Sequence, residues 1–186
     1  MEIMKKDRPY ELRTERLILR RYTMEDAEPL YRCLGSDPEM SKYSGWNPYA
    51  TLEMAQETVR RFIDSYDDKR SYSWIIDFDD ELAGTIGAYD YKYDPTGKCD
   101  QIEVGYSVVQ DWQGRGLATE ALIKVLEYLT ENEGISCVTA WCAAENIGSQ
   151  RVLEKSGMQL INTEKDGIAA GGRTYDKLIY EYRAID

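Results

Sequence analysis

The strongest constraint on the fold is one stretch in which a strand pattern runs directly into a helix pattern. Residues 99–109 read as a strand, and the run QGRGLA follows at residues 113–118. Apolar residues then recur at helical spacing, at Ala121, Leu122, Val125, Leu126 and Leu129. Two glycines at a helix start leave backbone N–H groups open, and the helix dipole favours a phosphate there. We predict a strand–turn–helix unit with a phosphate-binding turn, although a Gly-x-Gly turn alone also fits a plain tight turn.

Strand and helix patterns alternate along the rest of the chain. Further strands are predicted at residues 15–22, 71–78, 82–91, 135–143, 158–164 and 174–183. Helices are predicted at residues 24–34, 51–66 and 146–156, with Thr23 as an N-cap and a loop over residues 36–50. The turn Asp79-Asp80 predicts a hairpin between two strands. No repeat or low-complexity linker is present, so residues 1–186 are expected to form one domain with a mixed α/β sheet.

Composition excludes several classes of function. Lysine and arginine total 23 against 34 aspartates and glutamates, a net charge of −11, which argues against nucleic-acid or anionic-membrane partners. Histidine is absent, which removes histidine-based catalysis and nearly every zinc site, so we expect no metal. The cysteines at positions 33, 99, 137 and 142 show no metal-ligand spacing and are expected to stay reduced. With no apolar leader at the N-terminus, a cytoplasmic protein is predicted.

Several motifs resemble those of one enzyme family. The run from Ile102 to Ala121 resembles the acetyl-CoA motif of the GNAT acetyltransferases, whose turn reads Arg/Gln-x-x-Gly-x-Gly/Ala. The run ENIGSQRVLEKSGM at residues 145–158 resembles the family's second motif, and TERLILR at residues 14–20 resembles its RimJ/RimL-like branch. The resemblance implies a GNAT fold, with a mostly antiparallel sheet splayed at the acetyl-CoA site and flanked by helices. It also implies an N-acetyltransferase that uses acetyl-CoA as cosubstrate.

The resemblance implies a set of acetyl-CoA-binding residues. The pyrophosphate would lie on the turn formed by Gln113, Gly114, Arg115, Gly116, Leu117 and Ala118. A backbone N–H near Val108 would bind the thioester carbonyl, and Asn146 would orient the pantetheine amides or cap its own helix. Arg151 would lie near the adenosine phosphate, although for Arg151 a plain surface role is favoured. A solvated side chain explains Arg115 equally well.

Catalytic candidates also come from the resemblance. Glu103, on the strand that flanks the cleft, would take the proton of the amine, but an ion-paired surface glutamate fits equally well. Many GNAT proteins place a tyrosine acid seven residues after the motif asparagine, and here that position is Leu153. Ser149 is the substitute proton donor, or alternatively an ordinary first-turn serine.

Acceptor-binding candidates are aromatic. Tyr43, Trp46 and Tyr49 lie in the loop between the first two helices, and Tyr89 lies near the end of a strand. Strand alternation places Tyr91 and Tyr93 in the same cleft as Tyr89. The acceptor would be a protein N-terminus or a small-molecule amine, and a homodimer is allowed. The alternative function is a CoA-binding sensor or interaction module without efficient catalysis.

Overall fold

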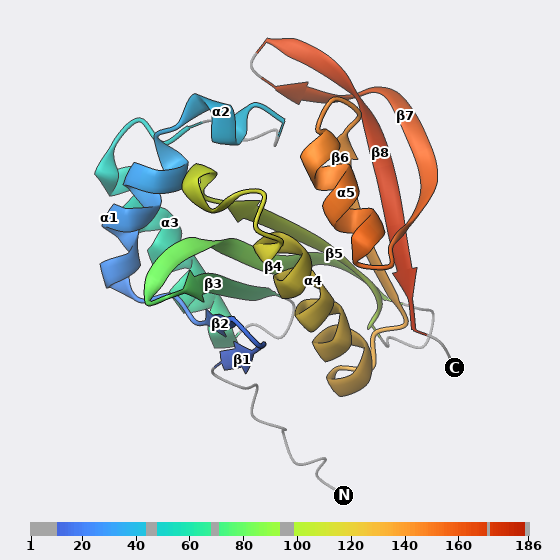
Figure 1. The fold of residues 1–186 in the computed structure, drawn as a ribbon, viewed down its shortest axis with the longest axis horizontal. Coiled ribbons are helices and arrows are strands. Elements are labelled where there is room, and N and C mark those ends of the chain that lie inside the picture. Colours follow the sequence, from blue (N-terminus) through green and yellow to red (C-terminus); the bar gives the residue numbers. More distant parts are fainter. Residues whose placement is uncertain (1–10, 44–47, 68–70, 94–98, 171, 185–186) are drawn as a thin grey trace, which may run out of the picture.

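The computed structural model describes residues 11–43, 48–67, 71–93, 99–170 and 172–184, and their strands form a single sheet (Figure 1). The strand order is β1-β2-β3-β4-β5-β6-β8-β7. The strands are β1 (Glu11–Arg13), β2 (Leu17–Arg20), β3 (Tyr72–Phe78), β4 (Glu81–Tyr93), β5 (Cys99–Val108), β6 (Cys137–Ala143), β7 (Gln159–Ala170) and β8 (Arg173–Arg183). Within the described residues, β5 and β6 are the one parallel pair. This confirms the predicted mixed, mostly antiparallel sheet.

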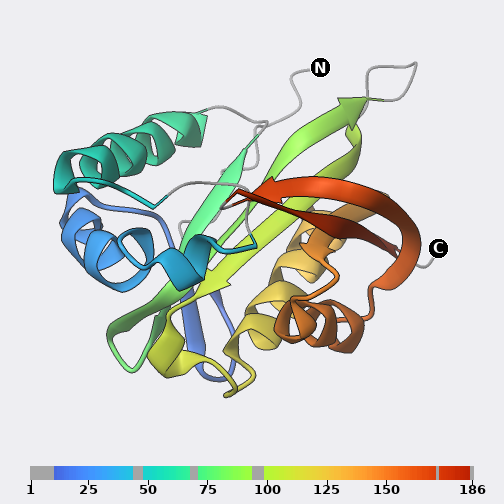
Figure 2. The ribbon, with the colours of Figure 1, turned by 90° about the horizontal axis from the view of Figure 1, so that it is seen from above.

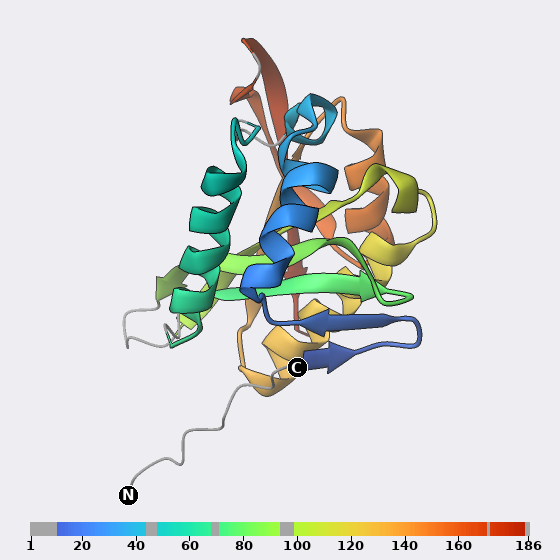
Figure 3. The ribbon, with the colours of Figure 1, turned by 90° about the vertical axis from the view of Figure 1, so that its left-hand side faces the viewer.

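Helices cover both faces of the sheet (Figures 2 and 3). They are α1 (Ala27–Leu30), α2 (Pro38–Ser41), α3 (Leu52–Asp64), α4 (Leu117–Glu127) and α5 (Ile147–Lys155). Alternate residues of β3 show the two layers, because Trp74 and Ile76 pack in the cluster that contains α4, whereas Ile75 packs in the cluster of α1 and α3. All five residues of the predicted inward stripe after the glycine turn are buried. That amphipathic pattern therefore fixed how α4 lies on the sheet.

The hairpin between β3 and β4 turns where the sequence predicted. Asp79 and Asp80 have φ values of 52° and 61°. Two successive residues in the left-handed region match the twist of the flanking antiparallel strands. The hairpin therefore brings β4 beside β3, and β4 then pairs with β5 along most of its length.

Several element boundaries differ from the predictions. The predicted helix over residues 24–34 is a 3-10 turn (η1, Met24–Asp26), then α1, then a π-helical turn (η2, Tyr31–Gly35). The predicted loop over residues 36–50 contains α2, which is capped by the Asp37 carboxylate accepting the Glu39 N–H at 2.9 Å. β1 was not predicted, and β7 extends to Ala170, beyond the predicted end at residue 164. For β1 and β7, pairing with the neighbouring strand decides where the strand lies and ends.

An arginine joins the start of the helical layer to the sheet. The guanidinium of Arg20, on β2, donates to Asp26 at 2.7 Å and to Asp77 at 3.3 Å. Burial alone would raise the pKa of Asp26, but hydrogen bonds from Arg20 and Thr23 hold that pKa below its usual value. This partly buried pairing anchors η1 against β2 and β3, away from the strands that carry the site.

Candidate active site

The sheet splits between its two central strands. β5 and β6 pair only at residues 101–103, which lie opposite residues 137–139. Beyond that point β5 continues beside β4, with Val108 opposite Gly84, and β6 continues beside β8, with Ala143 opposite Lys177. The two strands therefore diverge into a wedge, and the predicted splay is confirmed (Figure 1).

The wedge exposes a strand edge inside the sheet. The Val109 N–H donates to the Ala83 carbonyl at 2.8 Å, so residue 109 points its backbone groups at β4. Backbone groups alternate sides along a strand, and those of Val104, Tyr106 and Val108 consequently point away from β4. On the same side, the Ile102 carbonyl accepts a hydrogen bond from Thr139 on β6 at 3.3 Å. The wedge can therefore take an extended ligand that pairs with β5 as a strand would.

The glycine turn lies at the open end of the wedge, where α4 begins. Gly114 and Gly116 have φ values of 75° and 80°, and Gly116 is the N-cap of α4. Residues 113–116 are exposed, whereas Leu117 is buried beneath them and Ala118 is half-buried. N–H groups at a helix N-terminus can bind an anion, and the phosphate-binding role of this turn stays a prediction.

The side chains of this turn make contacts of their own. Gln113 Nε2 donates to the Val108 carbonyl at 3.0 Å and so ties the turn to the end of β5. The guanidinium of Arg115 lies over the ring of Trp112, 4.5 Å from its centroid. Arg16, from the loop between β1 and β2, donates to the Arg115 carbonyl at 3.1 Å. The turn is therefore supported both by its own strand and by a distant loop.

Helix α5 borders the other side of the wedge. Asn146 is its N-cap, with Oδ1 accepting the Ser149 N–H at 3.1 Å, while Arg151 is exposed on its surface. The Ser149 Oγ lies 2.8 Å from the hydroxyl oxygen of Tyr106 on β5. Burial raises the pKa of the Tyr106 hydroxyl and raises the pKa of the nearby Cys142 thiol to about 11. Two hydroxyl groups that stay protonated at neutral pH thus meet across the wedge.

Glu103 lies at the position on β5 where the wedge begins, and its side chain is on the face of β5 opposite to that of Tyr106. The Trp141 indole N–H donates to Glu103 Oε1 at 2.9 Å. Burial raises the pKa of Glu103, and the hydrogen bond from Trp141 and the positive charge of Lys177 counteract part of that effect. A half-buried carboxylate with a raised pKa is suited to accepting a proton.

Tyr89 covers the strand beside Glu103. Tyr89 on β4 is directly opposite Glu103 on β5, and it is 40% exposed. Its hydroxyl group lies over Gly105, where an added Cβ would be only 2.3 Å from the hydroxyl oxygen. The predicted placement of Tyr91 on the same face is wrong, because Tyr91 packs against the core that contains α4. Asp90 has a φ of 55° and the register shifts there, so a bulge inverts the alternation. Residues 94–98 and the side chain of Tyr93 lie outside the described residues.

The aromatic loop contributes only in part. Tyr43 contacts Tyr175 of β8, with ring centroids 5.3 Å apart, and packs with Trp141 in a small apolar cluster beside the wedge. Tyr49 instead lies against Gly35 of η2, where a Cβ would overlap its ring. Trp46 lies outside the described residues. Glu103 thus lies on a strand of the wedge, and Tyr89 lies beside it on β4. Tyr43 packs with Trp141 of β6, whereas Tyr49 lies against the helical layer.

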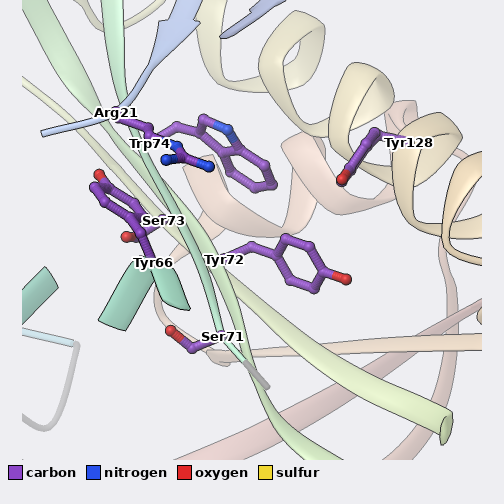
Figure 4. A pocket seen from close by; sticks show the side chains of 7 residues that line it. All are labelled: Arg21, Tyr66, Ser71, Tyr72, Ser73, Trp74 and Tyr128. Atoms are coloured by element: carbon purple, nitrogen blue, oxygen red, sulfur yellow. The ribbon is translucent and has the colours of Figure 1, made fainter. Parts of the chain in front are cut away.

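A small cavity lies elsewhere on the sheet (Figure 4). It is lined by Arg21, Tyr66, Ser71, Tyr72, Ser73, Trp74 and Tyr128 and centres on β3, two strands away from β5. Its volume of about 20 Å³ is enough for a single water molecule. In the described part of the chain there is no cluster of three metal-ligating side chains and no helix long and apolar enough to cross a membrane.

Three side chains of the site were missed by the sequence analysis. Tyr106 could have been found, because it shares the strand side of Val104 and Val108. Trp141 meets Glu103 only through the parallel register of β5 and β6, and no local pattern reports that register. The contacts of Arg16 with residues 115 and 120 likewise join segments far apart in the sequence.

Comparison with known proteins gives a consistent result. Residues 16–159 match the family model described as acetyltransferase (GNAT) domain. The uncharacterized N-acetyltransferase YoaA of Bacillus subtilis is 32% identical over 171 residues, which cover 91% of this chain and 94% of that protein. The glycine turn, the wedge and α5 all lie within the matched residues.

Solved structures share the fold. A GNAT-family acetyltransferase from Bacillus anthracis has a TM-score of 0.80 and 24% identity, covering 93% of this chain and 98% of that one. RimL, a ribosomal L7/L12 alpha-N-protein acetyltransferase in complex with coenzyme A, has a TM-score of 0.81 and 19% identity, covering 94% and 96%. At these identities the likeness concerns the fold.

Proposed function

The chain belongs to the GNAT acetyltransferase family, and on that basis we propose that it transfers the acetyl group of acetyl-CoA to a primary amine by direct attack in a ternary complex. The observation that carries the proposal is the open edge of β5, which ends at a helix N-terminus with exposed glycine amides. This arrangement suits a long ligand with an amide-bearing arm and a diphosphate end.

Acetyl-CoA would supply an activated acetyl group and a thiolate leaving group. The amides of residues 113–118 bind its diphosphate, and the Asn146 amide nitrogen is available to the pantetheine arm while Oδ1 caps α5. A backbone N–H near Val108, on the open edge of β5, donates to the carbonyl oxygen of the thioester as negative charge develops there, an effect worth about 3–4 kcal/mol in other oxyanion holes. Arg115 and Arg151 are exposed and supply positive charge near the phosphates.

Glu103 acts as the general base, directly or through one water. A primary amine is largely protonated at neutral pH, and it must lose a proton before or as its nitrogen attacks the acetyl carbon. The nitrogen–carbon bond forms, the carbon–sulfur bond breaks, and the sulfur leaves as thiolate. The Ser149 hydroxyl protonates the sulfur and regains a proton from Tyr106 or solvent, which serves the role of the missing tyrosine on α5.

The acceptor is a small amine or a protein N-terminus. The neighbour RimL is named for acetylating the ribosomal protein L7/L12 at its alpha-amino group, which supports a protein acceptor. Tyr43, Tyr89 and Trp141 offer aromatic surface near Glu103 for either kind of acceptor. Trp46 and Tyr49 remain predicted acceptor contacts.

We further propose that residues 1–186 act as one acetyltransferase domain in the cytoplasm. The single sheet supports this, as do Cys33, Cys137 and Cys142, which are free thiols in the described residues. The net charge of −11 supports partners other than nucleic acid or membranes, and a homodimer is allowed. A CoA-binding sensor is the second candidate, favoured by the leucine at position 153.

The test measures release of the CoA thiol from acetyl-CoA with N-terminal peptides in one series and small amines in the other. The expected result is turnover in at least one series, with Glu103→Gln losing turnover while its acetyl-CoA affinity, measured by calorimetry, is kept. Acetyl-CoA binding without turnover in any series would support the sensor. Absence of acetyl-CoA binding would refute both functions.

A further inference from the structure

A carboxylate in the first turn of α4 is bound by the loop between β1 and β2. Thr14 Oγ1 donates to Glu120 Oε1 at 2.5 Å, and the Arg16 backbone N–H donates to the same oxygen at 3.0 Å. The Arg16 side chain donates from Nε to Glu120 Oε2 at 2.7 Å. These hydrogen bonds hold the pKa of Glu120 below its usual value despite partial burial. The Glu120 carboxylate is therefore ionised and held in place just after the glycine turn.

The same arginine also fixes the orientation of the peptide bond between Arg115 and Gly116. Arg16 Nη1 donates to the Arg115 carbonyl at 3.1 Å, and Arg16 Nη2 lies 3.6 Å from the position of a Cβ on Gly116. In a planar trans peptide the carbonyl and the following N–H point in opposite directions. Holding the Arg115 carbonyl toward Arg16 therefore directs the Gly116 N–H to the far side of that plane.

We propose that Arg16 is a positioning residue for acetyl-CoA: it holds the 115–116 peptide so that the Gly116 N–H faces the diphosphate, and Glu120 and Thr14 hold Arg16 in place. The inference rests on the proposed binding of acetyl-CoA at this turn. Glycines at 114 and 116 allow the peptide to rotate readily, so an external contact is needed to fix it. Arg16 also balances the negative charge that Glu120 would otherwise present to the phosphates.

Substitutions of Glu120 distinguish a positioning role of Arg16 from a purely electrostatic effect on the phosphates. If only charge mattered, Glu120→Ala would remove a negative group near the diphosphate and strengthen binding. In the positioning account Glu120→Ala releases Arg16, and the affinity for acetyl-CoA falls. Arg16→Ala misorients the Gly116 N–H and loses about tenfold in affinity, somewhat less than the complete loss of one hydrogen bond to a charged group would cost. Glu120→Gln keeps hydrogen-bonding capacity and loses less than Glu120→Ala.

The experiment is calorimetric titration of the full chain with acetyl-CoA, together with NMR of the Gly116 amide. Arg13→Ala is the matched control, because Arg13 lies on the same hairpin and pairs only with Glu11 among the described hydrogen-bond and ion-pair partners, at 2.7 Å. We expect weaker binding by Arg16→Ala and Glu120→Ala, unchanged binding by Arg13→Ala, and a smaller downfield shift of the Gly116 amide proton in the two weakened variants.

Three results would overturn the proposal. They are an unchanged acetyl-CoA affinity of Arg16→Ala, tighter acetyl-CoA binding by Glu120→Ala, or a ligand-induced Gly116 amide shift that is undiminished in both variants. A merely structural role would lower the thermal midpoint without changing the ligand-induced shift of Gly116. If the unsubstituted chain binds no acetyl-CoA, the proposed function fails instead, so the two failures are distinguishable.

Discussion

Replacement of Gly116 by alanine is the most direct test of whether the diphosphate of acetyl-CoA binds at the glycine turn. Gly116 has a φ of 80°, and a Cβ there would meet only the Arg16 side chain, at an ordinary 3.6 Å. The folding cost is therefore backbone strain, about 1 kcal/mol for an L-residue in the left-handed region. For a chain of this size, that cost lowers the thermal midpoint by about 2–4 °C.

Gly134 provides a matched control. It has a φ of 70°, a Cβ there would meet nothing within 4 Å, and it follows the end of the α4 segment opposite the turn. Gly134→Ala should cost the same strain without touching the ligand. Both variants are compared by thermal unfolding with and without acetyl-CoA at about 100 times the Kd of the unsubstituted protein. Such a concentration stabilises a binding protein by about 2.7 kcal/mol, or about 5–11 °C.

The expected outcome separates strain from binding. Gly134→Ala should show the full ligand-induced rise. In Gly116→Ala the added methyl group displaces the diphosphate from the amide, and losing a hydrogen bond to a charged group costs about 2 kcal/mol. The ligand-induced rise should then shrink to about 2–3 °C. If Gly116→Ala keeps the full rise, the diphosphate does not lie on this turn and the reasoning is wrong.

Three further predictions follow from the same contacts. Glu103 must be ionised to act as base and burial raises its pKa, so the acid limb of the kcat/KM pH profile lies above the ordinary glutamate range; Trp141→Phe removes a donor that lowers this pKa and should move the limb to higher pH. Ser149→Ala and Tyr106→Phe should each lower kcat at least about tenfold with unchanged acetyl-CoA affinity, and an unchanged kcat would leave water as the proton donor. Arg20→Leu should lower the unfolding free energy at pH 7 by about 3 kcal/mol, as measured in urea, without changing acetyl-CoA affinity. The loss should shrink as pH falls, because a carboxyl whose folded pKa is lowered stabilises the protein only while it is ionised.

Local patterns predicted the parts of the fold that local physics controls. The apolar period after the glycine turn placed α4, and the Asp79-Asp80 turn placed the hairpin. Alternation failed at Asp90, where one residue in the left-handed region moves Tyr91 to the other face of the sheet. A bulge of this kind depends on the partner strand, so a single strand sequence does not announce it.

The site itself depends on pairs that only the assembled sheet creates. Glu103 meets Trp141 because β5 and β6 are parallel and in register for three residues, and Tyr106 meets Ser149 because they then diverge. Motif spacing located Glu103 and Ser149 but could not supply their partners. Trp141 and Tyr106, the contacts of Glu103 and Ser149, were therefore the part of the site that the sequence alone did not predict.

The wedge persists because each of its strands is paired elsewhere. β5 keeps its hydrogen bonds to β4, and β6 keeps its hydrogen bonds to β8, so neither needs the other beyond residue 103. The Tyr106–Ser149 contact joins β5 to α5 across the gap. An unpaired strand edge is normally a liability, since it invites another strand. Here that edge lies inside the sheet and ends at the glycine turn, and under the proposed function the partner it selects is an extended, amide-bearing molecule with a negatively charged end.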